Sequence, residues 1–503
     1  MQNNDLFIIL TIILYMVMVI WIGIDCSKKN KTSDDFYLGG RKLGPFVTAM
    51  SAEASDMSSW LLMGLPGVAL AGSVAEASWT AIGLALGTYI NWLIVARRLR
   101  LYSAKINAIT IPDFFSNRYR DRSNVIVLVA ALIIVVFFVP YTASGFSACG
   151  KLFSTLFGFD YFWAMVVSAV VIVLYTMLGG FLAASTTDFV QSIVMSIALV
   201  VVLGFGVFNA GGISAVVENA QELPGYLSLT AYSGADGVGS YNLLDIASTL
   251  AWGLGYFGMP HILLRFMAIE DEAKLKLSRR IATVWVVFSM FIAIVIGVVG
   301  YSLVKNGVVT GLEDSERIIV AIAKIIASFG PFAAIVAGVI ISGILASTMS
   351  TADSQLLAAS SSMSHNILKN VFAKNVTDKT LMLISRASLL VIAVIGIFIA
   401  KNPDSSVFGI VSFAWAGFGA TFGPVMLAAL FWKRSNRWGA MAGMLVGGIM
   451  IFVWKFCIKP FGGIWGIYEL LPAFVCAAIA IVVVSLLTPK PEKEIVEEFE
   501  SVC

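Results

Sequence analysis

The stretch PFVTAMSAEASDMSSWLLMGLPGVALAG, residues 45–72, decides the fold. It is long and apolar enough to cross a bilayer, for which about 20 residues suffice. Its centre nevertheless carries six polar side chains within nine residues, namely Ser51, Glu53, Ser55, Asp56, Ser58 and Ser59. A charge at bilayer depth costs roughly 2.5–3.5 kcal/mol even on a lenient scale, so these groups must face protein or a wet cavity. Because Gly64 and Pro66 follow, the pattern predicts a discontinuous helix whose freed backbone groups form a binding site near the midplane. A polar seam between packed helices would suit the serines but not both carboxylates.

The composition of the 503-residue chain sets its class. It is 59% hydrophobic and only 13% charged, whereas soluble domains average about 25% charged residues. The apolar runs do not alternate with period two, so we predict an all-α polytopic membrane protein and not a β-barrel. No nucleotide-binding loop or nucleophile motif is present, which argues against an enzyme or an ATP-driven pump. Five cysteines lack metal-site spacing and indicate free thiols: Cys26, Cys149, Cys457, Cys476 and Cys503.

The apolar runs predict about thirteen transmembrane helices. They fall at 6–25, 45–72, 77–97, 124–149, 161–182, 186–210, 243–266, 280–305, 331–365, 381–400, 407–431, 439–458 and 467–487. The segments that follow odd-numbered spans hold 24 Lys and Arg residues, against 7 on the other side. The positive-inside rule therefore predicts an external N-terminus and an internal C-terminus in the cell membrane.

A second interrupted span lies at 243–266. Four helix-weakening residues crowd its centre between Trp252 and Tyr256 or just beyond, namely Gly253, Gly255, Gly258 and Pro260. Two five-span units that each open with a broken helix have opposite topology, which is the pattern of an inverted repeat. We therefore predict an extra N-terminal helix and cytoplasmic loop (1–44), repeat one (45–210), an external loop (211–242), repeat two (243–431), two extra C-terminal helices (432–488) and a cytoplasmic tail (489–503).

The inner half of the ninth span carries a third set of polar residues: Ser347, Ser350, Thr351, Asp353 and Ser354. Hydroxyl and carbonyl oxygens at this density suit a hard cation, although Ser and Thr also form hydrogen bonds between helices. Asp188 is either a carboxylate at a membrane boundary or part of a second ion site with Asp353.

Two further segments are less specific. For residues 98–123 the sequence predicts either a cytoplasmic helix lying on the membrane surface or an ordinary basic loop. For the charged tail at 489–503 it predicts a mobile end.

Four stretches resemble the sodium/solute symporter family, and the first two are specific to its proline branch. They are YLGGRKLGPFVTAMSAEASDMSSWLLMGLPG (37–67), LAWGLGYFGMPHILLRFMA (250–268), ILASTMSTADSQLL (344–357) and VSFAWAGFGATFGP (411–424). The resemblance implies a leucine-transporter-type fold with a five-plus-five inverted repeat.

The resemblance also implies roles for individual residues. Na⁺ would be held by the backbone oxygens of Ala54, Met57 and Ser347 and by the hydroxyls of Ser350 and Thr351. Asp56 would lie near the ion, and Arg41 matches a cytoplasmic arginine linked to coupling. The substrate pocket would contain Ser58, Trp60, Tyr141, Trp252, Tyr256 and Pro260. The chain departs from the family at Glu53 and Ser59, where the family has glycine, at Met259, where it has glutamine, and at Ser347, where it has alanine.

The implied function is Na⁺-coupled secondary active import of L-proline by alternating access. The chemistry fits, because unwound helix ends offer N–H groups to a carboxylate and carbonyls to an ammonium, and aromatic faces can cover a ring. The expected partners are Na⁺ as coupling ion, L-proline and the lipid bilayer, with no nucleic acid. The alternative is a Na⁺- or H⁺-coupled symporter of another small organic solute, with Glu53 as the group for a proton.

Overall fold

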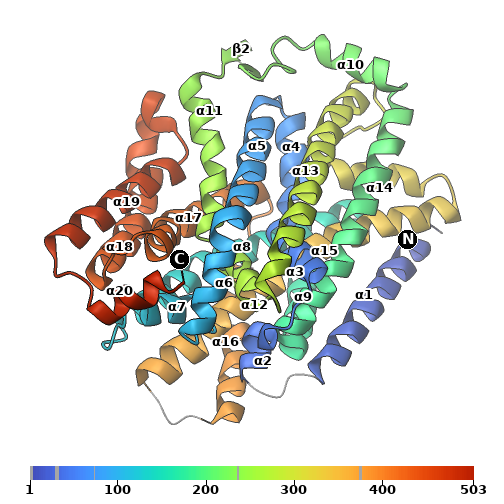
Figure 1. Ribbon diagram of the computed structural model, residues 1–503. Coiled ribbons are helices and arrows are strands. Elements are labelled where there is room, and N and C mark those ends of the chain that lie inside the picture. Colours follow the sequence, from blue (N-terminus) through green and yellow to red (C-terminus); the bar gives the residue numbers. More distant parts are fainter. Residues whose placement is uncertain (1–3, 29–32, 73, 235–236, 373–376, 503) are drawn as a thin grey trace.

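The computed structural model describes the chain except for residues 1–3, 29–32, 73, 235–236, 373–376 and 503. In this part of the chain ten helices are long and apolar enough to cross a membrane. Three shorter apolar helices accompany them, at Trp60–Leu70, Tyr161–Met177 and Leu243–Phe257. The structure is therefore that of an all-α polytopic membrane protein, with one small β-hairpin outside the bundle (Figure 1).

The long helices are α1 (Asp5–Ser27), α5 (Val74–Ile90), α8 (Val125–Phe157), α9 (Tyr161–Asn209), α13 (Leu275–Lys305), α15 (Pro331–Ser361), α16 (Asp378–Ile399), α17 (Val407–Phe431), α18 (Arg437–Val453) and α19 (Leu470–Leu487). The short elements are α2 (Ser33–Leu38), α3 (Pro45–Asp56), α4 (Leu65–Leu70), α6 (Ala96–Lys105), α7 (Ile111–Arg118), α10 (Ile213–Gln221), β1 (Ala231–Gly234), β2 (Gly237–Ser240), α11 (Leu243–Leu250), α12 (Pro260–Ala268), α14 (Ile318–Ala327) and α20 (Lys493–Glu500).

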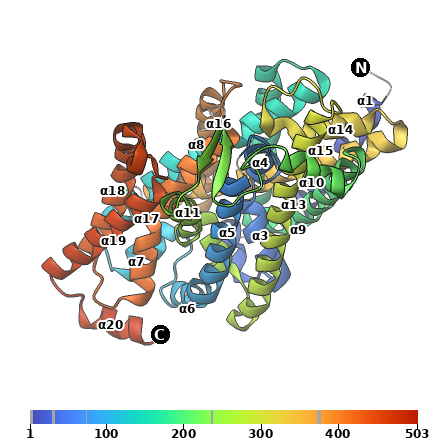
Figure 2. The same ribbon diagram turned by 90° about the horizontal axis from the view of Figure 1, so that it is seen from above.

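The broken helices lie inside the bundle. α3 packs against α9, α13 and α15, while α17, α18 and α19 pack together on one side of the molecule, opposite α1 (Figure 2). We call the two ends of the bundle the α10 end and the α7 end. The β-hairpin lies at the α10 end, where Ser233 donates a backbone hydrogen bond of 3.0 Å to Gly72 after α4.

Glycines allow α5 to approach the second broken helix very closely. A Cβ atom on Gly87 would lie 2.3 Å from the carbonyl oxygen of Gly253, and one on Gly253 would lie 2.2 Å from that of Gly83. Larger residues would push the two segments apart, so these glycines hold the break against α5.

The predicted spans at 161–182 and 186–210 are joined in α9. The chain kinks at Gly180, where φ is 65° and ψ is −172°. This backbone conformation favours glycine, which explains how one continuous run of apolar residues contains two helices.

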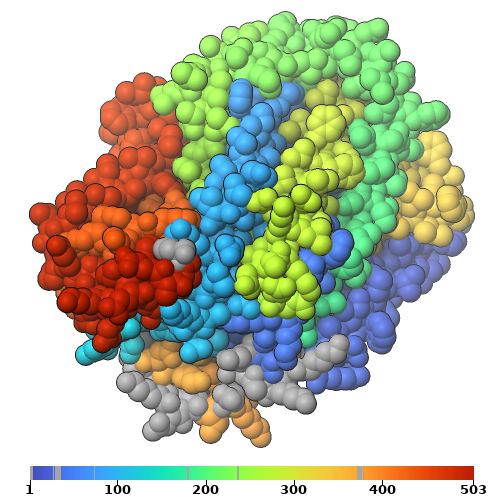
Figure 3. Space-filling view, in the orientation of Figure 1, coloured from blue at the N-terminus to red at the C-terminus, as the bar shows by residue number. Residues whose placement is uncertain are grey.

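Two predictions about peripheral segments are wrong. In the segment 98–123, α7 packs into the protein instead of lying on the membrane surface, because most of it is buried, including Phe114 and Phe115. The tail differs from the predicted mobile end, because it forms the helix α20, which packs onto the molecule (Figure 3) with Ile495 and Phe499 buried. These two residues are four positions apart and therefore lie on one face of α20, which is apolar. In the sequence this face is hidden by the high charge of the tail.

Candidate functional site

The break in the second span frees a backbone carbonyl. In a continuous helix the N–H of Ser58 would bond to the carbonyl of Ala54, four residues earlier. Here Ser58 N instead donates to the carbonyl oxygen of Asp56 at 2.8 Å, and a π-helical turn, Trp60–Gly64, leads into α4. The Ala54 oxygen is thereby available to another partner.

α15 supplies that partner. Ser350 Oγ lies 2.8 Å from the Ala54 oxygen and 3.2 Å from the oxygen of Ser347. Thr351 Oγ1 lies 3.5 Å from the same Ala54 oxygen. Four of the five predicted Na⁺ ligands therefore meet, and all of them are buried. Met57, the fifth, is buried within the break itself, where its N–H bonds to Glu53.

The two carboxylates of the second span face different partners. Asp56 Oδ2 accepts a hydrogen bond of 2.5 Å from the hydroxyl of Tyr256, in the second broken helix. Glu53 Oε1 accepts one of 2.9 Å from Trp92 Nε1, in the third predicted span. Asp56 therefore links the two breaks directly. The second oxygen of each carboxylate is buried and lacks a hydrogen-bond partner in the described part of the chain.

The second break has a cause that can be traced to one residue. Pro260 begins α12 and has no N–H, so the carbonyl of Tyr256, four residues earlier, loses its helical partner. Asn91 Nδ2 replaces that partner at 3.0 Å. The preceding 3₁₀ segment, Ala251–Phe257, is tied to α17 by Trp415 Nε1, which donates to the oxygen of Trp252 at 2.8 Å.

Aromatic rings gather between the two breaks. The rings of Trp60 and Trp252 have centroids 6.2 Å apart, and Phe408 lies 5.3 Å from Trp252. Tyr468 stacks on Trp252 at 5.1 Å with an interplanar angle of 20°.

The remaining predicted pocket residues lie beside these rings. Tyr141 reaches the break, since its hydroxyl donates to the backbone oxygen of Asp56 at 3.3 Å. Ser58 Oγ lies 3.4 Å from the backbone nitrogen of Trp60. Sequence reasoning missed Phe408, Trp415 and Tyr468. Only Trp415 lies in one of the motifs, and nothing in the sequence shows that Tyr468 approaches Trp252.

Arg265 is a further residue that sequence reasoning missed. Its guanidinium donates to Asp188 at 3.1 Å, to Ser354 at 2.6 Å, to Ser51 at 3.0 Å and to the oxygen of His261 at 2.8 Å. Asp188 is fully buried in α9, where it faces Arg265.

Asp353 belongs to the same cluster through its neighbour. Its Oδ1 accepts a hydrogen bond of 3.2 Å from Ser354, which also accepts from Arg265. One guanidinium thus faces two carboxylates. One oxygen of each, Asp188 Oδ1 and Asp353 Oδ2, is buried without a partner among the described residues.

Arg41 lies apart from these residues. It donates to the backbone oxygens of Met267 and Ala108, at 2.7 Å each, and to Ser103. It therefore connects the chain before α3 to α12 and to the α6–α7 loop at the α7 end.

A cluster of one buried lysine and two carboxylates lies at the α10 end. The buried Lys151 of α8 lies 2.7 Å from Glu316 and 2.8 Å from Asp314. Glu316 also accepts hydrogen bonds from the backbone N–H groups of Val407 and Phe408, both at 3.0 Å, at the start of α17. Phe408 in turn touches the Trp252 ring.

Lys151 favours the ionised form of Asp314. Partial burial opposes its ionisation, but the hydrogen bond and charge of Lys151 outweigh burial and hold its pKa below the ordinary value. A depressed carboxyl pKa contributes stability that is present above the unfolded pKa and is lost as pH falls through the folded one. The ion pair therefore persists at neutral pH.

The fold defines a class: a multi-pass membrane protein of the transporter type, in which two broken helices meet inside the bundle. The chain belongs to the sodium:solute symporter family, whose model matches residues 36–447. It is therefore a transporter and not an enzyme.

Its relatives are similar over nearly their whole length. The chain is 41% identical to the osmoregulated proline transporter OpuE of Bacillus subtilis, over 97% of this chain and 96% of the relative. It is 40% identical to the sodium/proline symporter of Escherichia coli, over 98% and 95%, and 42% identical to that of Haemophilus influenzae, over 98% and 97%.

Solved structures show the same fold. A Na⁺-coupled sialic acid symporter in a substrate-bound outward-open state matches with a TM-score of 0.78 at 17% identity, over 97% of this chain and 99% of that chain. Mhp1, a nucleobase-cation-symport-1 family transporter, in a closed conformation matches with a TM-score of 0.57 at 15% identity, over 94% and 99%. The leucine-transporter-type fold is thus confirmed.

Proposed function

We propose that the chain imports L-proline together with Na⁺ by alternating access. The observation that carries the proposal is the contact between Ser350 and the freed carbonyl of Ala54, which ties α15 to the break in the second span. The names of the relatives, sodium/proline symporter and proline transporter, support the substrate and the ion.

The proposed topology has thirteen crossings, with the N-terminus outside and the C-terminus inside. The α10 end then faces outward and the α7 end inward. The ten long apolar helices and three shorter ones supply thirteen candidates. In the proposed division, repeats 45–210 and 243–431 each open with a broken helix, flanked by the extra helices, loop and tail described above.

Na⁺ would bind where the oxygens of α3 and α15 converge. The proposed ligands are the carbonyls of Ala54, Met57 and Ser347 and the hydroxyls of Ser350 and Thr351. These are uncharged oxygens, which suit a hard monovalent cation that must later be released. An ion there would replace the present hydroxyl–carbonyl hydrogen bonds and hold the break against α15.

L-proline would bind between the breaks. Trp60, Trp252 and Tyr256 would cover its ring and attract its ammonium group. Tyr141, Ser58 and Pro260 would complete the pocket, with carboxylate recognition by freed N–H groups.

Coupling between Na⁺ and proline follows because both proposed sites use the break in the second span. If Na⁺ shapes the pocket, proline binds the ion-loaded form better, and reciprocity requires proline to raise the affinity for Na⁺ equally. At −100 mV one Na⁺ supplies about 2.3 kcal/mol from the membrane potential alone. The Glu316 cluster would close the outer side, because it draws Phe408 over Trp252.

The function is tested by counterflow of labelled proline in proteoliposomes with Na⁺, and with choline in its place. We expect exchange only with Na⁺. Exchange of another solute but not proline would replace the proposed substrate while leaving the symport mechanism in place.

Tyr256 offers a test of the pocket. Tyr256→Phe keeps the ring but removes the hydroxyl that donates to Asp56, and a hydrogen bond to a charged group contributes about 1.5–3 kcal/mol. We expect a weaker affinity for Na⁺ and a nearly normal affinity for proline at saturating Na⁺, measured by equilibrium binding. Tyr256→Ala also loses its contact with Trp415 and should weaken both. Normal proline binding in the alanine variant would remove Tyr256 from the pocket.

Glu53 offers a test of the alternative, proton coupling. Glu53 and Asp56 lie three residues apart on one buried helix, and two such carboxylates resist ionising together without a cation. We expect the Na⁺ concentration for half-maximal uptake to rise as external pH falls from 8 to 5.5. Glu53→Gln, whose amide oxygen can still accept from Trp92, should flatten this dependence. Identical profiles would leave Glu53 a structural residue, and uptake driven by a pH gradient without Na⁺ would favour the alternative.

A further inference from the structure

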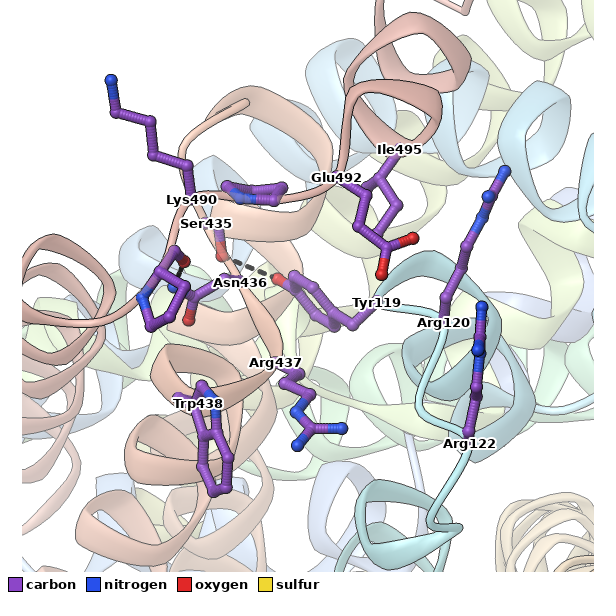
Figure 4. A pocket seen from close by; sticks show the side chains of 12 residues that line it. Tyr119, Arg120, Arg122, Ser435, Asn436, Arg437, Trp438, Lys490, Glu492 and Ile495 are labelled. Atoms are coloured by element: carbon purple, nitrogen blue, oxygen red, sulfur yellow. Dashed lines mark hydrogen bonds between the residues drawn. The ribbon is translucent and has the colours of Figure 1, made fainter.

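A cavity at the α7 end is lined by three segments that are far apart in the sequence. They are residues 119–122, between α7 and α8, residues 435–438, at the start of α18, and residues 489–495, which run from the end of α19 into the first turn of α20 (Figure 4). Its volume is about 400 Å³. The hydroxyls of Tyr119 and Ser435 join the first two segments at 2.9 Å. None of these residues belongs to the proposed transport site.

The cavity is strongly basic. Four of its lining side chains are cationic, Arg120, Arg122, Arg437 and Lys490, whereas its lining holds one carboxylate, Glu492. Figure 4 shows Arg437 beside Trp438 on one edge and Arg120 and Arg122 along another.

Two of these four cations have a carboxylate partner in the described part of the chain and two do not. Arg120 pairs with Glu494 and Glu498 on α20. Arg437 lies 4.0 Å from Asp121, whose oxygens already accept hydrogen bonds from Ser123 and from the N–H of Ile126. Within the described residues, no carboxylate lies within 4.0 Å of the exposed Arg122 or Lys490.

The cavity lies where apolar helices end. α8 begins at Val125, α18 begins at Arg437 and α19 ends at Leu487, directly beside the three lining segments. Leu487 is 81% exposed and Trp438 is 43% exposed. Exposed apolar residues of a membrane protein face lipid, and tryptophan favours the headgroup level, so the cavity opens at the membrane–water interface.

We propose that this cavity binds a phosphate-bearing anion, and that its source is the headgroup of an anionic phospholipid. Guanidinium and ammonium groups are the usual partners of phosphate oxygens, and basic pockets between helices on the inner side of a membrane suit lipid headgroups. A soluble phosphate offers the same chemistry, but the position at the interface favours the lipid. The bound anion would connect the α7–α8 loop, the start of α18 and the C-terminal segment.

The test uses the purified full-length protein in a neutral detergent. Thermal unfolding is followed while phosphatidylglycerol, phosphatidylcholine or inorganic phosphate is titrated at constant ionic strength. We expect phosphatidylglycerol to raise Tm with saturation, and the other two to have little effect.

Charge variants then locate the effect. Arg122→Gln with Lys490→Gln should require roughly 25-fold more phosphatidylglycerol for half the effect, about fivefold for each cation removed. Glu492→Gln should require less lipid, because it removes the one lining carboxylate. The matched control, Lys276→Gln with Arg280→Gln, removes one exposed Lys and one exposed Arg from α13 and should behave like the wild type.

Each outcome decides between the sources. Stabilisation by inorganic phosphate that is lost in the Arg122 and Lys490 variant would assign the cavity to a soluble phosphate. Equal lipid requirements in the wild type and that variant would overturn the proposal. Should the double variant fail to fold, the two exposed single variants, each with a fivefold expectation, provide the same test.

Discussion

Ser350→Ala is expected to raise the Na⁺ concentration for half-maximal proline uptake by at least tenfold. Its hydroxyl lies within hydrogen-bonding distance of two carbonyls, those of Ala54 and Ser347, and all three are proposed ion ligands. Losing an interaction with a charged partner costs about 1.5–3 kcal/mol, which corresponds to a factor of ten or more. The measurement is initial uptake at saturating proline over a range of Na⁺ concentrations.

Thr351 provides the control for this prediction. Thr351→Ser retains a hydroxyl and should be mild, whereas Thr351→Ala should resemble Ser350→Ala. Equal damage from serine and alanine at this position would indicate that the methyl group packs α15 against α3 and that the hydroxyl does not bind the ion.

Much of the fold and part of the site could be predicted because the signals are local. Carboxylates within an apolar run are incompatible with a continuous membrane helix, and so are several glycines followed by Pro260. Both conflicts are independent of the tertiary structure around them. The structure confirms both breaks. It also brings the ninth span to the first break, a contact that the hydroxyls of Ser350 and Thr351 suggested and the resemblance supported.

The missed features depend on tertiary contacts. Arg265 lies near the end of an apolar span, where an arginine is expected to reach the interface, and its burial depends on Asp188 in a distant helix. Tyr468 reaches the aromatic cluster because α19, which follows it, packs against the 3₁₀ segment that contains Trp252. Tyr468 and Trp252 are almost 220 residues apart in the sequence. The docking of α20 depends on two apolar residues, Ile495 and Phe499, which a count of charged residues in the tail does not reveal.

Arg265→Gln is expected to have the largest effect on stability. The guanidinium is 1% exposed and is ion-paired to Asp188, while Asp353 belongs to the same hydrogen-bonded cluster. Removing one partner of a buried ion pair costs about 3–5 kcal/mol, because the remaining charge stays buried without compensation. We expect little folded protein in the membrane, measured by detergent-solubilised yield and thermal unfolding.

A double substitution distinguishes a role of the Arg265–Asp188 ion pair from a role of Arg265 in packing alone. Arg265→Gln with Asp188→Asn removes both charges and should recover a large part of the lost stability, since neutral amides can still bond to Ser51 and Ser354. If the losses of Arg265→Gln and Asp188→Asn simply add, Arg265 acts through shape and its charge is unimportant.

A separate pair of variants tests the second ion site predicted for Asp188 and Asp353. Two carboxyl groups share this one guanidinium, and each has a buried oxygen without a partner in the part of the chain that the structure describes. A cation there would make Na⁺ raise Tm more than choline does in Ser350→Ala, in which the first site is impaired, and Asp353→Asn in that background should abolish the difference. A difference that survives Asp353→Asn would leave the cluster as an ion pair alone.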